Sequence, residues 1–167
     1  MLSPVYTIGY QERSIEQFVA LLKRHQIAVL VDVRSRPTSS FEPDFSLKPL
    51  QSYLETRGIQ YVYLGKMLGG FPEDPDAYTN GKTDYAKLRQ KPYYHEGIEQ
   101  LLELWEQGRR LALMCFEIRP QECHRALLVG ETLNEQGIEV VHIDETGGLK
   151  AHQVVIEEAR QARAAKQ

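Results

Sequence analysis

The sequence repeats one pattern: an amphipathic segment ends at a glycine or polar residue, and a short apolar run follows at once. Several of these runs are almost continuously apolar, as strands covered on both faces are. Parallel strands need crossover helices between them. The alternation therefore predicts an α/β fold in which a mostly parallel five-stranded sheet lies between two helical layers, a three-layer α/β/α arrangement. The predicted strands cover 5–9, 27–33, 59–64, 111–115 and 138–143.

Local signals mark the ends of the predicted helices. Ser14, with Gln17 three residues later, matches the capping-box pattern of a helix start. Ser46 can cap a second helix that stops at Gly58, because a residue without a Cβ atom adopts the left-handed conformation at low cost. A later helix is expected over about 121–136.

The chain length indicates one domain. A chain of 167 residues can bury one full core but is too short for two ordinary domains. We therefore predict a single α/β domain over residues 1–167. The stretch 65–92 has weak periodicity and is predicted to be a loop-rich insert. A C-terminal helix is expected from about 150, and its polar end is expected to fray.

Charge and hydropathy restrict the class of partner. A formal net charge of -3 argues against a protein that coats nucleic acid through bulk positive charge. The chain has no apolar run of about 18 residues, and its first ten residues lack the basic start and apolar core of a signal peptide. We therefore expect a cytoplasmic protein without a membrane partner. In that compartment Cys115 and Cys123 are expected to be reduced thiols rather than a disulfide.

Many candidate site residues follow the predicted strands. Ligands of open parallel sheets bind beyond the carboxyl ends of the strands, where the loops come together. The residues expected at this rim are Gly9, Tyr10, Arg34, Arg36, Leu68, Gly69, Gly70, Cys115, Glu117 and Arg119.

The segment CFEIRPQECHR (115–125) is expected in the middle of this rim. Its second half is predicted to be the first turn of a helix, where free N–H groups and the helix dipole favour an anion. Arginine adds forked donors that suit phosphate or carboxylate. The segment thus predicts an anion site with Arg125 as a principal contact. The arginines expected to contribute are Arg34, Arg36, Arg119 and Arg125.

The reactive candidates each have a structural alternative. Cys115 ends an apolar strand and either packs there or reacts. Cys123 is expected in a helical first turn near two arginines, an environment that lowers thiol pKa, or else it packs beneath the sheet. Glu117 is either a general acid or base or a partner that holds an arginine. Arg34 either binds a ligand or pairs with Asp32.

No metal site is predicted. Cys123 and His124 would lie about 100° apart around a helix and would be poorly placed to bind one ion. The other histidines are scattered along the chain. His124 is instead a candidate to move a proton beside the thiols. The sequence does not identify a cofactor.

Four motifs resemble one family, catalogued as domain of unknown function 488. They are YTIGY (6–10), LVDVRSRP (30–37), YLGKMLGG (63–70) and LMCFEIRPQECHR (113–125). The resemblance covers nearly the whole chain, and the last motif is the most specific. It implies a shared fold and site without an established reaction. The sequence departs from the family at Tyr10 and Gln11, where His-Ser or His-Asn is more usual.

A more remote similarity is to rhodanese-like sulfurtransferases. VDVR (31–34), a strand-end cysteine and GIEVVHIDETGGLKAH (137–152) follow the order of elements in those proteins. Their cysteine sits in a six-residue anion loop and accepts sulfur. The loop after Cys115 is longer, contains Glu117 and lacks the expected glycine.

Two functions fit these residues. In the first, a small enzyme holds a phosphorylated or nucleotide-like anion, a cysteine acts as nucleophile, and Glu117 or His124 moves the proton. In the second, a non-catalytic module binds a nucleotide or nucleic acid with the same donors, and tyrosines provide stacking surfaces. The first is slightly favoured. Both predict one cleft that is approached by Gly9, Arg34, Leu68, Cys115, Glu117 and Arg125.

Overall fold

A computed structural model describes residues 2–166. Its main element is a six-stranded sheet with the order β3-β2-β6-β1-β7-β8, in which the first five strands are parallel. The predicted α/β fold with a mostly parallel sheet is therefore confirmed. The strands are β1 (Val5–Gly9), β2 (Val29–Asp32), β3 (Gln60–Tyr63), β6 (Leu111–Cys115), β7 (Val140–Ile143) and β8 (Leu149–Ala151).

The sixth strand, β8, corrects the expectation of five strands. It pairs with β7 in the antiparallel direction because the connection between them is a tight turn, too short for a crossover. In this turn Asp144 Oδ1 accepts hydrogen bonds from the backbone N–H groups of Thr146 and Gly148. Gly147 has a φ of 85°, which a residue without a Cβ atom adopts readily.

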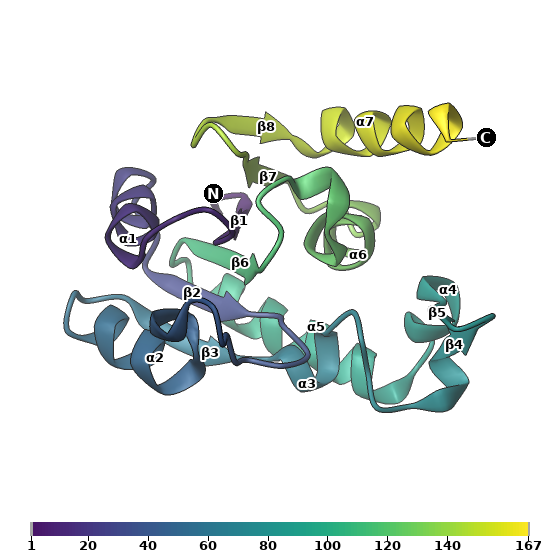
Figure 1. The fold of residues 1–167 in the computed structure, drawn as a ribbon, viewed down its shortest axis with the longest axis horizontal. Helices are drawn as coiled ribbons and strands as arrows, with labels where there is room; N and C mark the ends of the chain where they lie inside the picture. The colour runs from purple at the N-terminus through teal and green to yellow at the C-terminus, as the bar shows by residue number, and fades with distance from the viewer. Residues whose placement is uncertain (1, 167) are drawn as a thin grey trace.

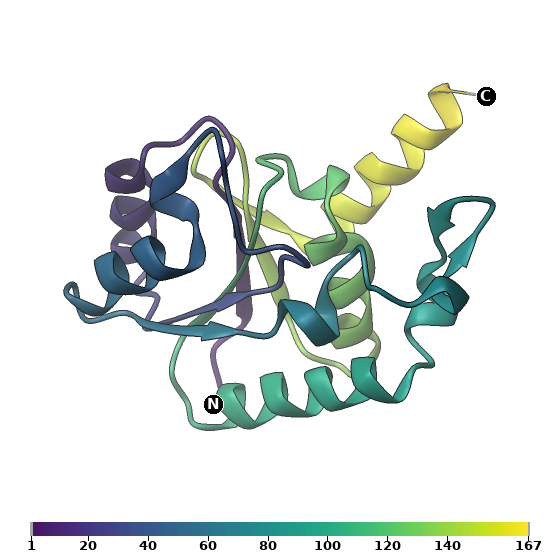
Figure 2. The ribbon, with the colours of Figure 1, turned by 60° about the horizontal axis from the view of Figure 1, so that its bottom comes forward.

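Helices cover both faces of the sheet and form a three-layer domain (Figures 1 and 2). The helices α1 (Ile15–Arg24) and α2 (Leu47–Glu55) bury Phe18 and Leu50 against one face. The helices α5 (Pro92–Glu106) and α6 (Glu131–Glu135) pack on the other face. Successive residues of the strands alternate between these two cores, as side chains of a strand do. None of the helices in residues 2–166 is long and apolar enough to cross a membrane.

Of the two predicted serine caps, the one at α1 forms and the one at α2 does not. At α1 the predicted capping box forms, because Ser14 Oγ accepts from Gln17 N and Gln17 Oε1 accepts from Ser14 N. Ser46 does precede α2, but its side chain does not cap that helix. Its hydroxyl oxygen instead accepts a hydrogen bond from the backbone N–H of Ser39 at 2.9 Å.

The segment 65–92, predicted to be a loop-rich insert, has short elements joined by loops. It contains α3 (Gly65–Leu68), a 3₁₀ turn (Pro75–Ala77), α4 (Tyr85–Leu88) and a small hairpin of β4 (Tyr78–Thr79) and β5 (Lys82–Thr83). The hairpin projects from the rest of the domain in Figure 2. Asn80 and Gly81, at its tip, both have positive φ, as in the Asn-Gly turns typical of two-residue hairpins.

The expected helix over 121–136 is wrong in its first part. Pro120–Glu122 forms a 3₁₀ turn, and Cys123 is extended, with φ -127° and ψ 145°. A π-helical segment (Arg125–Gly130) then leads into α6. The side chain of Arg125 is fully buried and reaches the loop that follows β6. This contact spans only eight positions, but it requires the 3₁₀ turn that folds the segment back, and helical periodicity does not report such a turn.

The last helix, α7 (His152–Ala165), begins directly after β8. The sequence places this start near 150, where the structure has the edge strand instead. The buried side chains of α7 are in its first eight residues, at His152, Val155 and Ala159. Its second half extends away from the domain in Figure 2.

Candidate functional site

A cleft of about 630 Å³ opens where β1, β2 and β6 end. The parallel register places Gly9 beside Cys115 and Asp32 beside Met114, so the loops after all three strands meet at one edge. Hereafter "the cleft" means the space lined by Tyr10, Arg34, Ser35, Arg36, Thr38, Ser39, Ser40, Phe41, Gly70, Phe71, Pro72, Glu73, Tyr78, Cys115, Phe116, Glu117 and His124.

One wall of the cleft contains a buried ion pair. Asp32 accepts two side-chain hydrogen bonds from Arg34, at 3.0 and 2.8 Å, and a third hydrogen bond from the Tyr61 hydroxyl. Burial disfavours the charged guanidinium, but the bonds and charge of Asp32 outweigh it and raise the pKa of Arg34. Arg34 Nη1 is buried and donates no hydrogen bond to the described residues. Arg34 is therefore both a structural partner of Asp32 and a cleft residue with an unused donor.

Aromatic side chains surround the cleft. The chain has five phenylalanines, of which two are buried in the core and three line the cleft. The three at the cleft are Phe41, Phe71 and Phe116, with 95%, 71% and 46% of their surface exposed. Tyr10 supports this rim from below, since its ring packs edge-on against Phe116 at 5.3 Å. Exposed aromatic groups gathered at one cleft indicate a binding surface.

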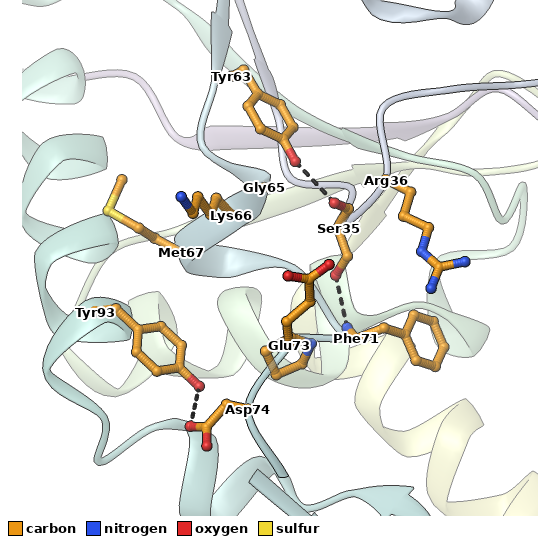
Figure 3. A pocket seen from close by; sticks show the side chains of 11 residues that line it. Ser35, Arg36, Tyr63, Gly65, Lys66, Met67, Phe71, Glu73, Asp74 and Tyr93 are labelled. Atoms are coloured by element: carbon orange, nitrogen blue, oxygen red, sulfur yellow. Dashed lines mark hydrogen bonds between the residues drawn. The ribbon is translucent and has the colours of Figure 1, made fainter. Parts of the chain in front are cut away.

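Residues 70–73 form a strap, of which Phe71, Pro72 and Glu73 line both the cleft and a second pocket of about 530 Å³. Figure 3 shows the lining of this second pocket. Ser35 Oγ accepts a hydrogen bond from Phe71 N at 2.8 Å and so holds the strap to the loop after β2. Thr83 Oγ1, in the hairpin, donates to the carbonyl oxygen of Gly70 at 2.7 Å. The strap is thus fastened from both sides.

The second pocket contains a polar cluster of its own. Asp74 accepts a hydrogen bond from the Tyr93 hydroxyl at 2.8 Å and pairs with Lys91 at 3.1 Å (Figure 3). These bonds stabilise the carboxylate and lower the pKa of Asp74. The carboxylate of Asp74 therefore already has partners, while Lys66 and Arg36, which also lines the cleft, add positive charge to this pocket.

The two cysteines are not separate thiols. A disulfide joins Cys115, at the end of β6, to Cys123. The prediction of reduced thiols is therefore wrong for this structure. The loop between them turns back through the 3₁₀ turn, so that both side chains point to the floor of the cleft. Both cysteines are buried, and of the two only Cys115 is part of the cleft lining.

His124 lies beside the disulfide. Its Nε2 is 2.8 Å from the carbonyl oxygen of Val33, and its Nδ1 is 3.7 Å from Cys123 Sγ. Burial lowers the pKa of His124 to about 4, so the ring is neutral near pH 7. The sequence argument that Cys123 and His124 point apart is wrong, because Cys123 is extended rather than helical.

Arg125 is a support for the cleft rather than part of its lining. Its guanidinium donates to the carbonyl oxygens of Glu117 at 2.7 Å and Ile118 at 3.3 Å. Nη1 also lies 3.7 Å from Cys115 Sγ. Full burial lowers the pKa of Arg125 to about 9. Gly9 lies directly beneath, and a Cβ atom there would overlap the Glu117 carbonyl oxygen.

The structure brings together seven of the predicted site residues: Tyr10, Arg34, Arg36, Gly70, Cys115, Glu117 and His124 line the cleft. The other six do not line it. Gly9, Leu68, Gly69, Cys123 and Arg125 are buried around it, and Arg119 is exposed, 3.9 Å from Glu145. Of the six residues predicted to approach one cleft, Arg34, Cys115 and Glu117 line it, whereas Gly9, Leu68 and Arg125 do not.

The sequence reasoning missed the aromatic rim. Phe41 and Phe71 lie in segments without periodicity, where a large apolar side chain has no local reason to be buried. The available signal was a phenylalanine among polar residues, because exposing such a side chain to water is unfavourable unless it serves binding. Ser35 was missed although it lies between Arg34 and Arg36, and Glu73 was missed because only the strap brings it to the cleft.

The comparisons with known proteins give one match. The family model described as "Domain of unknown function DUF488" matches residues 14–132, more than half of the chain. No curated protein and no solved structure matches the chain.

Proposed function

The chain belongs to the DUF488 family, whose description assigns no reaction, and we propose from the cleft itself that the protein binds a nucleotide-like anion. The observation that carries this proposal is the combination of all three exposed phenylalanines with Arg34 and Arg36 in one cleft. A ligand that satisfies both features has a planar ring and an anionic group.

The arginines favour an anion at one side of the cleft. Arg34 Nη1 is a buried donor that bonds no atom of residues 2–166, and a buried donor left unpaired costs about 1–3 kcal/mol. A phosphate oxygen supplies the missing acceptor. Arg36 is exposed at the same wall and can bind the same group in forked geometry.

The remaining lining suits a nucleobase. Aromatic side chains stack on bases with about 1–3 kcal/mol per base, whatever the base. Glu73 and Glu117 also line the cleft, and their carboxylates accept hydrogen bonds from ring or exocyclic N–H groups. Inorganic phosphate alone would meet these two negative charges without a ring to stack. A nucleotide therefore suits the lining better than a simple anion does.

Calorimetric titration with ribonucleotides, the matching nucleosides and a short single-stranded oligonucleotide tests the proposal. We expect a nucleotide to bind at least about tenfold more tightly than its nucleoside, because a charge-assisted hydrogen bond contributes roughly 1.5–3 kcal/mol. Arg36→Ala and Phe71→Ala should each weaken binding by about tenfold. Added salt should weaken it further, through screening of the exposed Arg36.

The matched controls are Arg160→Ala and Leu149→Ala, which remove an exposed arginine and an exposed apolar side chain far from the cleft lining. Both should leave affinity unchanged. Absence of nucleotide binding at millimolar concentration, or equal affinity in Arg36→Ala and wild type, would refute the proposal. Binding of the oligonucleotide alone would support the nucleic-acid alternative instead.

A second candidate function is thiol chemistry on the bound ligand, and the position of Cys115 in the cleft lining favours it. The disulfide must first be reduced. A cytosolic location, as the sequence predicts, would supply reducing conditions. Cys115 Sγ then lies 3.5 Å from Glu117 Oε2, close enough for the thiol to donate a hydrogen bond to the carboxylate. In this candidate Cys115, rather than Cys123, is the nucleophile.

A further inference from the structure

Three atoms that can bind a metal ion meet at the floor of the cleft. The sulfurs of Cys115 and Cys123 and a ring nitrogen of His124 lie within 4.8 Å of one another. We propose that the reduced chain binds one Zn²⁺-like transition-metal ion through these three residues. The donor set is one that zinc prefers, since its protein sites combine thiolate sulfur with imidazole nitrogen. The inference does not depend on nucleotide binding.

The hydrogen bond of His124 leaves the correct nitrogen free. A carbonyl oxygen only accepts hydrogen bonds, so the contact with Val33 O at 2.8 Å places the ring hydrogen on Nε2. Nδ1 therefore carries the lone pair, and Nδ1 is the atom 3.7 Å from Cys123 Sγ. Histidines that bind metals commonly donate their other N–H to a carbonyl or carboxylate, which orients the ring.

The surroundings of the sulfurs also suit bound thiolates. The backbone N–H of Arg125 donates to Cys123 Sγ at 3.4 Å, and Arg125 Nη1 donates to Cys115 Sγ at 3.7 Å. Such N–H groups offset the charge that two thiolates add. The Cα atoms of the cysteines are 7.5 Å apart, beyond the roughly 4.4–6.8 Å usual in disulfides. Once reduction breaks the S–S bond, this Cα spacing allows the two sulfurs to separate around an ion.

The fourth coordination position would face the cleft. Cys115 and His124 both line it, and Cys123 closes the site from behind. Glu117 Oε2 is 3.5 Å from Cys115 Sγ and can reach this position, as can water. Three protein ligands with an open fourth position are typical of catalytic rather than structural zinc sites.

Metal binding and the disulfide exclude each other. A phosphine reductant gives two electrons to the S–S bond and takes an oxygen atom from water, so that the phosphine becomes a phosphine oxide and the water protons complete two thiols. A divalent ion then displaces both thiol protons and binds two thiolates. The oxidised chain offers only His124 and Glu117, and it should bind the ion weakly.

Titration of the phosphine-reduced, metal-free chain with Co²⁺, followed by Zn²⁺ competition, tests this. We expect one ion per chain, the visible absorption bands of tetrahedral Co²⁺ with thiolate ligands, and loss of those bands when Zn²⁺ displaces Co²⁺. Zn²⁺ should also protect both cysteines from alkylation, as read by mass spectrometry. Oxidised wild-type protein, which keeps the same fold and sequence, should show neither effect.

Two variants separate the site from folding. His124→Gln keeps an N–H donor for the Val33 carbonyl but loses the imidazole ligand, and we expect it to weaken Zn²⁺ binding at least about tenfold. His95→Gln changes an exposed histidine elsewhere and should have no effect. Equal affinity of reduced wild type and His124→Gln, or unchanged alkylation in the presence of Zn²⁺, would overturn the proposal. Fast alkylation of Cys115 despite bound Zn²⁺ would favour the thiol-nucleophile candidate. Nucleotide binding is measured separately on the metal-free protein, so that failure of one proposal does not count against the other.

Discussion

Single residues at the rim show how buried arginines position loops. Arg13 donates to the carbonyl oxygens of Gly9 and Asp144, both at 2.6 Å, and Arg125 donates to those of Glu117 and Ile118. A guanidinium has five N–H donors in a fixed plane, so one side chain can tie two loops together. These contacts hold the ends of β1, β6 and β7 in place around the cleft.

Gly9 is the residue whose size this arrangement restricts most directly. A Cβ atom there would overlap the Glu117 carbonyl oxygen and lie 2.5 Å from Arg125 Nη1. Overpacking typically costs about 1–3 kcal/mol, so we expect Gly9→Ala to lower the free energy of unfolding by at least about 2 kcal/mol in urea denaturation. At Gly148 a Cβ atom would make only ordinary contacts. Gly148→Ala is the control, and equal stability of the two variants would contradict this account.

At the scale of elements, the small hairpin supports the strap. The hairpin consists of the short paired strands β4 and β5, and it bonds the strap twice. Thr83 Oγ1 donates to the Gly70 carbonyl at 2.7 Å, and the hydroxyl of Tyr78, which itself lines the cleft, donates to the Pro72 carbonyl at 2.8 Å. The strap in turn presents Phe71 and Glu73 to the cleft. An element distant in the sequence from the strand ends therefore shapes the lining.

Thr83→Val tests this support. Valine keeps the shape of threonine but removes the hydroxyl, so the Gly70 carbonyl loses its donor. We expect nucleotide affinity to fall severalfold and the free energy of unfolding to fall by about 1 kcal/mol. Thr79→Val, in the same hairpin, removes a hydroxyl that bonds Asp84 rather than the strap. If both variants bind nucleotide alike, the strap does not depend on Thr83.

At the scale of the whole molecule, a buried hydrogen-bond chain connects both helical and sheet elements. Glu131 accepts from His152 Nε2 at 2.7 Å, His152 Nδ1 accepts from His142 Nε2 at 2.9 Å, and His142 Nδ1 accepts from Thr7 at 2.6 Å. The direction of these hydrogen bonds follows from Glu131: an ionised carboxylate can only accept, so His152 Nε2 must donate to it and His152 Nδ1 is left to accept. The hydrogen-bond chain joins α6, α7, β7 and β1.

This hydrogen-bond chain predicts that the free energy of unfolding falls in acid. Burial, with Arg125 and His152 nearby, lowers the pKa of His142 to about 2, whereas an unfolded histidine titrates near 6.5. Below about pH 6.5 the unfolded state binds a proton that the folded state does not, so stability falls with acidity by up to about 1.4 kcal/mol per pH unit from this group.

The measurement is urea denaturation between pH 7 and pH 5. His142→Gln can retain both hydrogen bonds but cannot titrate, so its stability should depend less on pH than that of wild type. His95→Gln, which removes an exposed histidine, controls for the loss of one titrating group. Parallel stability profiles for wild type and His142→Gln would show that His142 does not cause the acid sensitivity.

The strand order and the insert show where local patterns stop being informative. Five parallel strands follow from apolar runs and intervening amphipathic segments, and the capping box at Ser14 is a contact between near neighbours. The edge strand β8 has three residues, none of them buried, so it has no apolar pattern to detect. The Asn80-Gly81 turn did carry a readable hairpin signal.

The sequence by itself determined the parallel sheet, the edge at which its strands end, and the residues that this edge must carry, because periodicity and chain direction are local properties. Only the tertiary structure decided which of those residues share a cleft. The extended backbone at Cys123 and the burial of Arg125 beneath the loop after β6 depend on how the segment 115–125 folds back on itself, and the strap that carries Phe71 is held by Ser35, 36 positions away. Those contacts form when the cores pack, and no local pattern encodes them.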